Sequence, residues 1–143
     1  MTMELKVKKI HTAAKLPAYG HPGDAGLDLF SCVDEALGPG EVKAIPTGLE
    51  MAIPPGFVGL VWDKSGLSLE AVHRLAGVVD AGYRGEVRVV LANLGRRTFK
   101  ISQGMKIAQM LIQSVQSVDV VEADTLDATS RGRGGFGSTG RYS

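Results

Sequence analysis

The sequence has very little cysteine and almost no net charge, and each of these two features excludes certain classes of protein. It holds one cysteine, Cys32, among 143 residues, so no intrachain disulfide can form and a reducing compartment is expected. Its charge is nearly balanced, with 16 Lys and Arg against 15 Asp and Glu. The chain therefore has no overall basic charge to attract a polyanion, and we predict no nucleic-acid partner.

Long apolar runs are also missing. The longest, such as residues 89–92, are far shorter than the roughly 20 residues that a membrane-spanning helix needs. The first ten residues alternate in polarity and lack the apolar segment and small-residue cleavage site of a signal peptide. We therefore expect a cytoplasmic protein with no membrane partner.

Two patterns that carry chemistry are absent as well. No G-x-x-x-x-G-K-[ST] sequence occurs, which excludes a P-loop. The three histidines (His11, His21 and His73) are scattered, and no His/Cys group has metal-ligand spacing. We interpret the histidines as surface residues and Cys32 as a small buried side chain.

The residues that are abundant indicate an all-β fold. Nineteen glycines and six prolines, with few helical patterns, are typical of short strands joined by tight turns. A chain of this length is expected to form one domain. One short helical stretch is predicted at residues 69–74. Strands are predicted at residues 4–10, 25–31, 41–53 with a break at Pro46, 57–62, 78–79, 86–92, 99–101 and 105–115.

The stretch from Ala76 to Gly95 most needs a functional explanation. Its second half alternates, with residues 87, 89 and 91 apolar on one face. The preceding sequence from Asp80 to Tyr83 predicts a turn that closes a hairpin. Such a turn holds a carboxylate and a phenol three residues apart at one rigid end. An ordinary hairpin has no need of Tyr83, so we look for function here.

Two glycine-containing segments suit the binding of anions. In the first, Lys64-Ser65-Gly66, free backbone N–H groups stand beside a cation. Taken alone, this short pattern more often marks an ordinary turn than a phosphate site. The second is residues 130–143, with five glycines, three arginines and one phenylalanine, which cannot pack a core and is expected to be mobile without a ligand.

The residues alone leave two functions open for this second segment. One is an Arg-Gly segment that binds RNA. The other is a flap that closes over an anionic ligand, with Arg131 and residues 137–139 on phosphate oxygens and Phe136 stacked on a flat ring. For Asp28, which stands between two leucines, the residues leave two roles open: a cap of a turn, which is slightly favoured, or a functional carboxylate. Together with the Asp80 turn, the glycine segments indicate phosphoryl chemistry on a nucleotide.

Five motifs, in order, resemble those of the homotrimeric dUTP diphosphatase (dUTPase) family. They are Asp24–Leu29 (DAGLDL), Asp63–Leu67 (DKSGL), Gly77–Glu86 (GVVDAGYRGE), Gly104–Gln109 (GMKIAQ) and Arg131–Gly140 (RGRGGFGSTG). The resemblance implies a distorted jelly-roll β-barrel of the β-clip type over residues 1–129. It also implies a flexible C-terminal arm, residues 130–143, that closes over the active site. Each site of the homotrimer would draw on three subunits.

The same resemblance implies hydrolysis of dUTP to dUMP and pyrophosphate, which keeps uracil out of DNA and supplies dUMP. Asp80 is the implied general base for in-line attack of water on the α-phosphorus, and Tyr83 the residue that packs on the deoxyribose. Mg²⁺ is the implied cofactor, held mainly by phosphates and water, with Asp28 reached through a water. The other implied substrate-binding residues are Lys64, Ser65, Gly66 and Gln109 on the phosphate chain, Val78 and Val79 on the uracil edge, Arg131, Gly137, Ser138 and Thr139 on the γ-phosphate, and Phe136 on the uracil face.

Two positions depart from the family pattern. Lys64 stands where the second motif usually has arginine, and lysine keeps the charge but loses the bidentate fork. Arg74 stands six residues before Asp80, where many members have an asparagine that bonds to uracil, so base recognition is left to the backbone. Among rivals, a dCTP deaminase of the same fold needs a glutamate about ten residues after Asp80, where this chain has Val90. A non-catalytic nucleotide- or RNA-binding protein is the other alternative.

Overall fold

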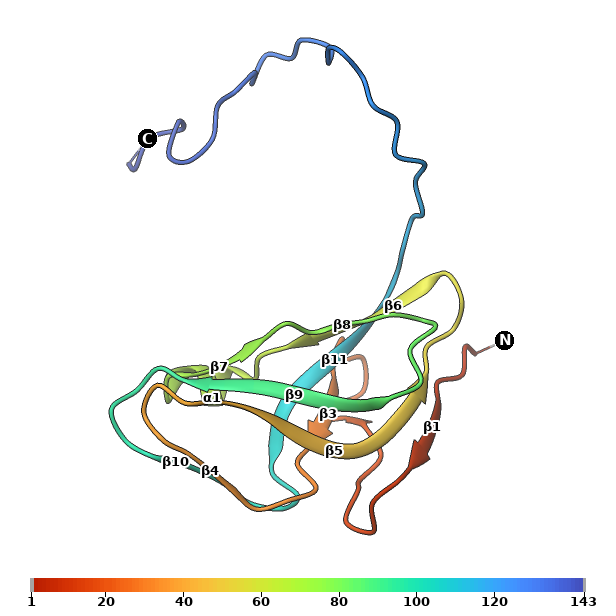
Figure 1. The fold of residues 1–143 in the computed structure, drawn as a ribbon, viewed down its shortest axis with the longest axis vertical. Coiled ribbons are helices and arrows are strands. Elements are labelled where there is room, and N and C mark those ends of the chain that lie inside the picture. Colours follow the sequence, from red (N-terminus) through yellow and green to blue (C-terminus); the bar gives the residue numbers. More distant parts are fainter. Residues whose placement is uncertain (1, 143) are drawn as a thin grey trace.

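The computed structural model describes residues 2–142, and two β-sheets make up most of it (Figure 1). The first sheet has the order β1-β5-β9-β7 and the second the order β2-β3-β11-β6-β8. A further pair joins β10 to β4, and one short helix, α1, follows β6. The bounds are β1 Lys6–Lys9, β2 Ala18–Tyr19, β3 Leu27–Phe30, β4 Glu35–Leu37, β5 Val42–Ala52, β6 Phe57–Trp62, α1 Ser65–Leu69, β7 Val72–Leu75, β8 Val78–Val79, β9 Glu86–Asn93, β10 Phe99–Ile101 and β11 Lys106–Ser114.

The apolar core is built by inward-facing residues of both sheets. The alternation predicted for β9 is confirmed, since Val87, Val89 and Leu91 are all buried. Leu29 on β3 and Ile107 on β11 join the same cluster from the second sheet. Full burial of one such side chain contributes about 1.5–3 kcal/mol, so the core is the main source of stability for a fold with many short strands.

The expected hairpin at Asp80 is wrong, although its turn is present. The N–H of Tyr83 donates to the carbonyl of Asp80 at 3.1 Å, as the turn requires. However, β8 pairs with β6 (Gly59 with Val79), whereas β9 pairs with β5 and β7. The segment therefore crosses from one sheet to the other. The β-branched pair Val78-Val79 and the alternation of β9 each indicate a strand, but the partner of each strand depends on residues far away in the chain.

The helix lies earlier than predicted. It spans Ser65–Leu69, whereas residues 72–75 form strand β7, which places Arg74 opposite Leu91. Ala71 adopts a positive φ of 61°, which ends the helical path before His73. The spacing of apolar residues at 69–74 favoured a helix, but the free edge of β9 pairs with this segment instead.

Three smaller differences concern the other strands. Strand β5 continues through Pro46, and it is the pairing register with β9 that shifts between Pro46 and Glu50. The short strands β2 and β4 were not predicted, because two or three residues carry no detectable period.

The predictions for Cys32 and the histidines are confirmed: Cys32 is buried, and all three histidines are exposed.

The last part of the described chain stands away from the barrel. Residues 115–142 contain no strand or helix and arch outward after β11 (Figure 1). The apolar residues Val118, Val120 and Val121 in this tail are exposed. The placement of the arm boundary at residue 130 stays a prediction.

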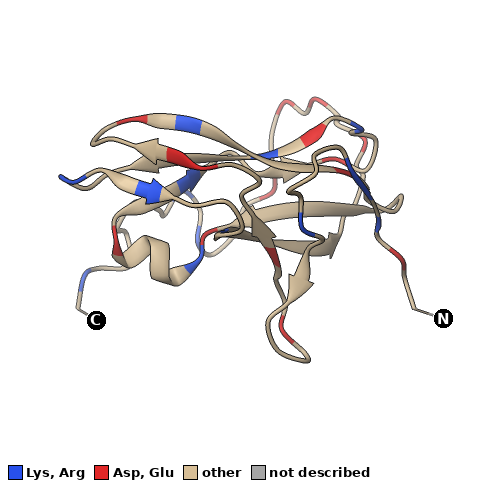
Figure 2. Cartoon of the chain, turned by 90° about the horizontal axis from the view of Figure 1, so that it is seen from below, with Lys and Arg blue, Asp and Glu red and all other residues tan. Residues whose placement is uncertain are grey.

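Charged residues of both signs are interspersed around the barrel rather than gathered by sign (Figure 2). This agrees with the near balance of charge in the sequence. Within residues 2–142, no helix is long and apolar enough to cross a membrane.

Candidate active site

Asp80 stands at a cavity of about 260 Å³ where the chain crosses between the sheets. The wall on one side is the Ala76–Val79 segment, whose conformation is set by Gly77. This glycine has a φ of 118°, and an added Cβ would come within 2.8 Å of the Val61 carbonyl. The Gly77 carbonyl in turn accepts a hydrogen bond from Val61 N–H at 2.8 Å. The cavity lining thus brings Val78, Val79, Asp80 and Tyr83 together, as the sequence predicted.

Tyr83 is fixed at this cavity by its own hydroxyl. The Tyr83 O–H donates to the carbonyl of Glu86 at 2.8 Å, while the ring remains half exposed. Gly85 makes this position possible, because a Cβ there would overlap the Tyr83 hydroxyl. Glu86 anchors the far end, with Oε2 accepting from Gly48 N–H at 3.0 Å and Oε1 paired with Arg88. The exposed ring is therefore held in one orientation, as a surface for packing requires.

Asp28 is the centre of a second group of predicted residues. Its side chain is 5% exposed, with Lys64 Nζ 2.7 Å from Oδ1 and Lys106 Nζ 3.1 Å from Oδ2. Burial raises the pKa of Asp28, but hydrogen bonds from the Lys64 and Lys106 ammonium groups outweigh it and hold the pKa below its usual value. Asp28 is therefore a paired carboxylate, and the Lys64 ammonium is engaged by it.

Gln109 connects this group to the loop after β6. It lies on β11 between Asp28 of β3 and Trp62 of β6, and its Nε2 donates to the Asp63 carbonyl at 2.9 Å. Gly26 leaves the room for this side chain, since a Cβ at Gly26 would overlap the Gln109 amide. The predicted phosphate residues Lys64 and Gln109 are thus adjacent through Asp63.

Ser65 and Gly66 open helix α1 and are exposed. The helix has no side-chain cap at Lys64, whose carbonyl accepts from Leu67 and Ser68 N–H. None of these residues lines the Asp80 cavity. Within one chain the predicted phosphate-binding residues and the Asp80 turn therefore do not share a cavity.

The predicted tail residues form a third separate group. Arg131 Nε donates to the carbonyl of Gly134 at 2.9 Å, and further local turns follow. Phe136 is fully exposed with a positive φ of 49°, which is uncommon for a residue with a side chain. Arg131, Phe136, Gly137, Ser138 and Thr139 do not line the Asp80 cavity.

Two functional candidates, Lys106 and Glu86, were given no role from the sequence, and a third, Arg74, was noted only as a departure from the family pattern. Lys106 lies in the fourth motif and is the only charged residue between positions 105 and 115, a signal that could have marked it. Glu86 lines the Asp80 cavity and holds the β5 bulge; its place at the end of the third motif could have marked it. Arg74 had been noted as a departure, and the structure engages it with Asp63 and Ala76.

The residues that the structure describes do not form a metal site from protein ligands alone. Among residues 2–142, no group of three or more His, Cys, Asp or Glu side chains is placed to bind a metal ion. Both oxygens of Asp28 already accept from ammonium groups. A water bridging Asp28 to Mg²⁺ would have to use a remaining lone pair, so this contact stays a prediction.

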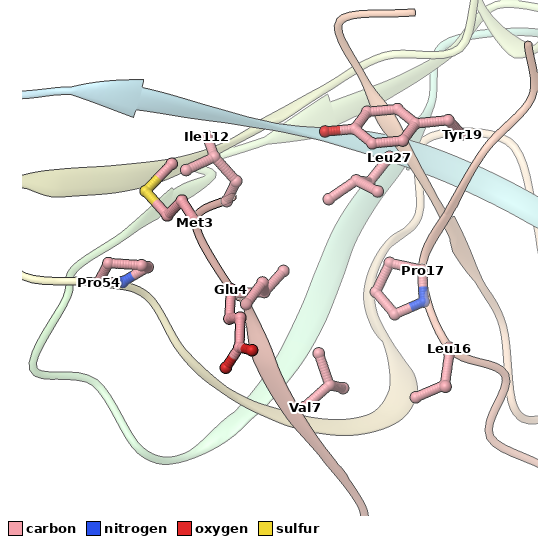
Figure 3. Close-up of a pocket in the computed structure, with 10 residues that line it drawn as sticks. Met3, Glu4, Val7, Leu16, Pro17, Tyr19, Leu27, Pro54 and Ile112 are labelled. Atoms are coloured by element: carbon pink, nitrogen blue, oxygen red, sulfur yellow. The ribbon is translucent and has the colours of Figure 1, made fainter. Parts of the chain in front are cut away.

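A larger hollow of about 440 Å³ lies apart from these groups, beside β1 and β2 (Figure 3). Its lining is mostly aliphatic and proline, including Leu16, Pro17, Leu27 and Ile112, with the ring of Tyr19 at one side. No predicted site residue lines it, so its size does not mark it as the reaction site.

The sequence model of the dUTPase family matches residues 12–140, which is most of the chain. The chain belongs to the dUTPase family. A deoxyuridine 5'-triphosphate nucleotidohydrolase of Gloeothece citriformis is 48% identical, covering 96% of this chain and 97% of that protein. One from Clostridium kluyveri is also 48% identical, covering 96% and 99% respectively.

Solved dUTPase structures share the fold closely. A mutant dUTPase of Staphylococcus bacteriophage 80alpha with dUpNHpp superposes with a TM-score of 0.93 at 27% identity, covering 98% of this chain and all of that one. A mutant dUTPase of S. aureus phage phi11, described with a structural Mg(II) ion, gives a TM-score of 0.81 at 26% identity, covering 86% and 98%. These likenesses confirm the all-β, dUTPase-type fold predicted from the motifs.

Proposed function

We propose that the chain hydrolyses dUTP to dUMP and pyrophosphate, with Asp80 as the general base. The observation that carries this proposal is the cavity at Asp80, where a carboxylate, the Tyr83 ring and the β8 backbone meet. These are the three elements needed to activate a water, contact a sugar and bond to a base. Membership of the dUTPase family supports the same reaction.

In the proposed reaction, Asp80 accepts a proton from the attacking water. The water oxygen bonds to the α-phosphorus while the bond from that phosphorus to the bridging oxygen of the β-phosphate breaks. Pyrophosphate leaves and dUMP remains, and the proton on Asp80 returns to solvent. Most of the rate acceleration in such transfers comes from positioning and charge stabilisation, which we assign to Lys64, Ser65, Gly66 and Gln109.

Selection of the base is assigned to the backbone of β8. This strand is the edge of its sheet, so one side of Val78 and Val79 has no neighbouring strand. Backbone N–H and C=O groups on such an edge can pair with the uracil edge, whereas cytosine presents a donor where uracil presents an acceptor. Tyr83 is assigned to the deoxyribose face, where its fixed ring would leave no room for a 2′-hydroxyl.

We further propose a homotrimer whose active sites combine residues of different subunits. The support is the separation of the three groups within one chain: the Asp80 cavity, the Asp28–Gln109 group and the tail. Exposed Trp62, Leu69 and Leu75 provide apolar surface for subunit contact. In this assembly Arg131, Gly137, Ser138 and Thr139 would close over the γ-phosphate and Phe136 over the uracil.

Mg²⁺ is proposed as the cofactor, bound mainly by the substrate phosphates and water, with Asp28 in contact through a water. When bound, it would neutralise charge on the phosphate chain. The residues of the chain that face the phosphates then orient them, and the tail excludes water. The single buried cysteine fits the cytoplasmic location expected above.

The test is product analysis of the purified chain with dUTP, dCTP or UTP and Mg²⁺. We expect dUMP and pyrophosphate from dUTP, with hydrolysis of dCTP and UTP slower by orders of magnitude but measurable at high enzyme concentration. We expect no turnover by Asp80→Asn, which should still bind dUTP. Release of orthophosphate, comparable turnover of UTP, or formation of dUTP from dCTP would each reject the assigned reaction. An active Asp80→Asn variant would reject the assigned base.

A mixing experiment tests the shared sites. Asp80→Asn subunits and subunits truncated after Thr129 should each be inactive alone and regain part of the activity when unfolded and refolded together. Continued inactivity of refolded mixtures that sediment as trimers would show that each site is built within one subunit.

A further inference from the structure

The side chain of Arg74 is largely buried, and its guanidinium makes contacts through both Nη1 and Nε. Its Nη1 donates to the Ala76 carbonyl at 2.7 Å, and its Nε lies 3.6 Å from Asp63 Oδ2. The guanidinium also lies over the Trp62 ring, 4.8 Å from the ring centre. Arg74 does not line the Asp80 cavity, so its side chain is not placed to bond to a base directly.

The segment that Arg74 holds is conformationally demanding. Ala76 has a positive φ of 57° and Gly77 one of 118°, and both residues line the Asp80 cavity. A left-handed alanine is unfavourable unless the surrounding contacts impose it. The Arg74 hydrogen bond to the Ala76 carbonyl is such a contact, and it fixes the residue from which β8 continues.

Asp63 supports Arg74 from the other side. Its Oδ1 accepts from the backbone N–H of Arg74 at 2.7 Å and lies 3.0 Å from His73 Nδ1. Its carbonyl is the one bonded by Gln109. The side chains of Asp63 and Arg74 are both largely buried, so their attraction is less screened than that of a surface pair.

The Nε atom of Arg74 shows how the guanidinium is held. It is buried and has no hydrogen-bond partner, because 3.6 Å to Asp63 Oδ2 is too long for one. A buried donor without a partner is unfavourable, so other contacts must set the side-chain position. Those contacts are the Ala76 carbonyl and the face of Trp62.

We infer that Arg74 is a positioning residue for base selection: it holds the Ala76–Gly77 turn, and through it the β8 edge, in the geometry that distinguishes uracil from cytosine. The inference rests on the proposed function, in which the β8 backbone reads the base. Arg74 acts through the backbone and need not touch the nucleotide. Its role therefore differs from that of the asparagine found at this position in many family members, which bonds to uracil directly.

The test compares kcat/KM for dUTP and for dCTP in the wild type, Arg74→Ala and Arg74→Lys. The ratio of the two constants does not depend on the fraction of folded enzyme, so a loss of stability alone leaves it unchanged. We expect Arg74→Ala to lower this ratio about tenfold, mainly through a higher KM for dUTP, because contacts to the base are the same in the ground and transition states. Lysine, which cannot contact Ala76 and Asp63 together, should lower it about threefold.

His73→Ala is the matched control. His73 contacts the same Asp63 carboxylate, through Oδ1 rather than Oδ2, but is exposed and has no bond to Ala76, so its loss should leave the ratio within about twofold of wild type. Trp62 is the only tryptophan of the chain, and its emission should change in Arg74→Ala and not in His73→Ala.

The outcomes separate this inference from the proposed function. A wild type without dUTP turnover rejects the function. An active wild type with an unchanged ratio in Arg74→Ala rejects only the positioning role. Should Arg74→Ala fail to fold, an unchanged ratio in Arg74→Lys has the same meaning.

Discussion

Lys64 Nζ lies 2.7 Å from Asp28 Oδ1, across a sequence separation of 36 residues. Lys106 approaches the other oxygen of the same carboxylate at 3.1 Å. Asp28 therefore joins the first, second and fourth motifs of the family through one buried acid. The cation beside Ser65 is oriented by this carboxylate, which keeps it close to the start of α1.

Replacing Asp28 should destabilise the protein in a pH-dependent way. Asp28→Asn removes the carboxylate that both lysines bond, and we expect a loss of about 2 kcal/mol at pH 7. The pKa of Asp28 is lowered in the folded state, so its contribution is complete above the usual Asp pKa and is lost as pH falls through the lowered value. The difference between variant and wild type should therefore shrink below about pH 4.

Urea unfolding at fixed protein concentration, at neutral and acid pH, measures this difference. Asp119→Asn, which changes an exposed carboxylate in the tail, is the control and should have no effect at either pH. A difference for Asp28→Asn that stays constant with pH would contradict the assigned ion pairs.

Gly26→Ala should displace Gln109. The added Cβ overlaps the Gln109 amide, so the bond from Gln109 to the Asp63 carbonyl would be lost. We expect a higher KM for dUTP and a loss of about 1–3 kcal/mol in stability from the forced movement. Gly20→Ala, whose Cβ would meet carboxylate oxygens of Asp24 and Asp28 at ordinary contact distances of 3.4 and 3.7 Å without displacing Gln109, should change neither quantity. Unchanged kinetics in a folded Gly26→Ala enzyme would remove Gln109 from the phosphate site.

Gly85→Ala should weaken selection of the sugar. A Cβ at Gly85 overlaps the Tyr83 hydroxyl, so the ring must leave its position beside the Asp80 cavity. The preference for dUTP over UTP, measured as the ratio of kcat/KM values, should fall about tenfold. Gly82→Ala lies in the same turn with no atom near the added Cβ and should keep the preference. Equal preferences in the two variants would show that Tyr83 does not select the sugar.

Truncation after Thr129 should separate activity from stability. Residues 130–142 are almost entirely exposed and make only local hydrogen bonds. The free energy of unfolding should therefore stay within about 0.5 kcal/mol of the full chain. Turnover of dUTP should fall at least about tenfold, because the groups proposed to close over the γ-phosphate are gone. Full activity of the truncated chain would reject the proposed role of the tail.

The sequence by itself determined most of the longer strands and the family. Alternation is a local property, so β9 and β11 could be located without a structure, and so could the buried face of Val87, Val89 and Leu91. The turn at Asp80 and the meeting of Asp80 with Tyr83 at one cavity were also predictable, because the two residues are only three positions apart. The five ordered motifs identified the family, which the comparisons confirmed.

Tertiary structure alone decided which distant residues meet. The pairing of β8 with β6 turned the expected hairpin into a crossing between sheets, and the free edge of β9 made residues 72–75 a strand. The pairing of Asp28 with Lys106 and the contact of Arg74 with Ala76 have no periodic signal. Such contacts depend on burial and on the relative placement of strands, which the whole chain fixes together and no local pattern encodes.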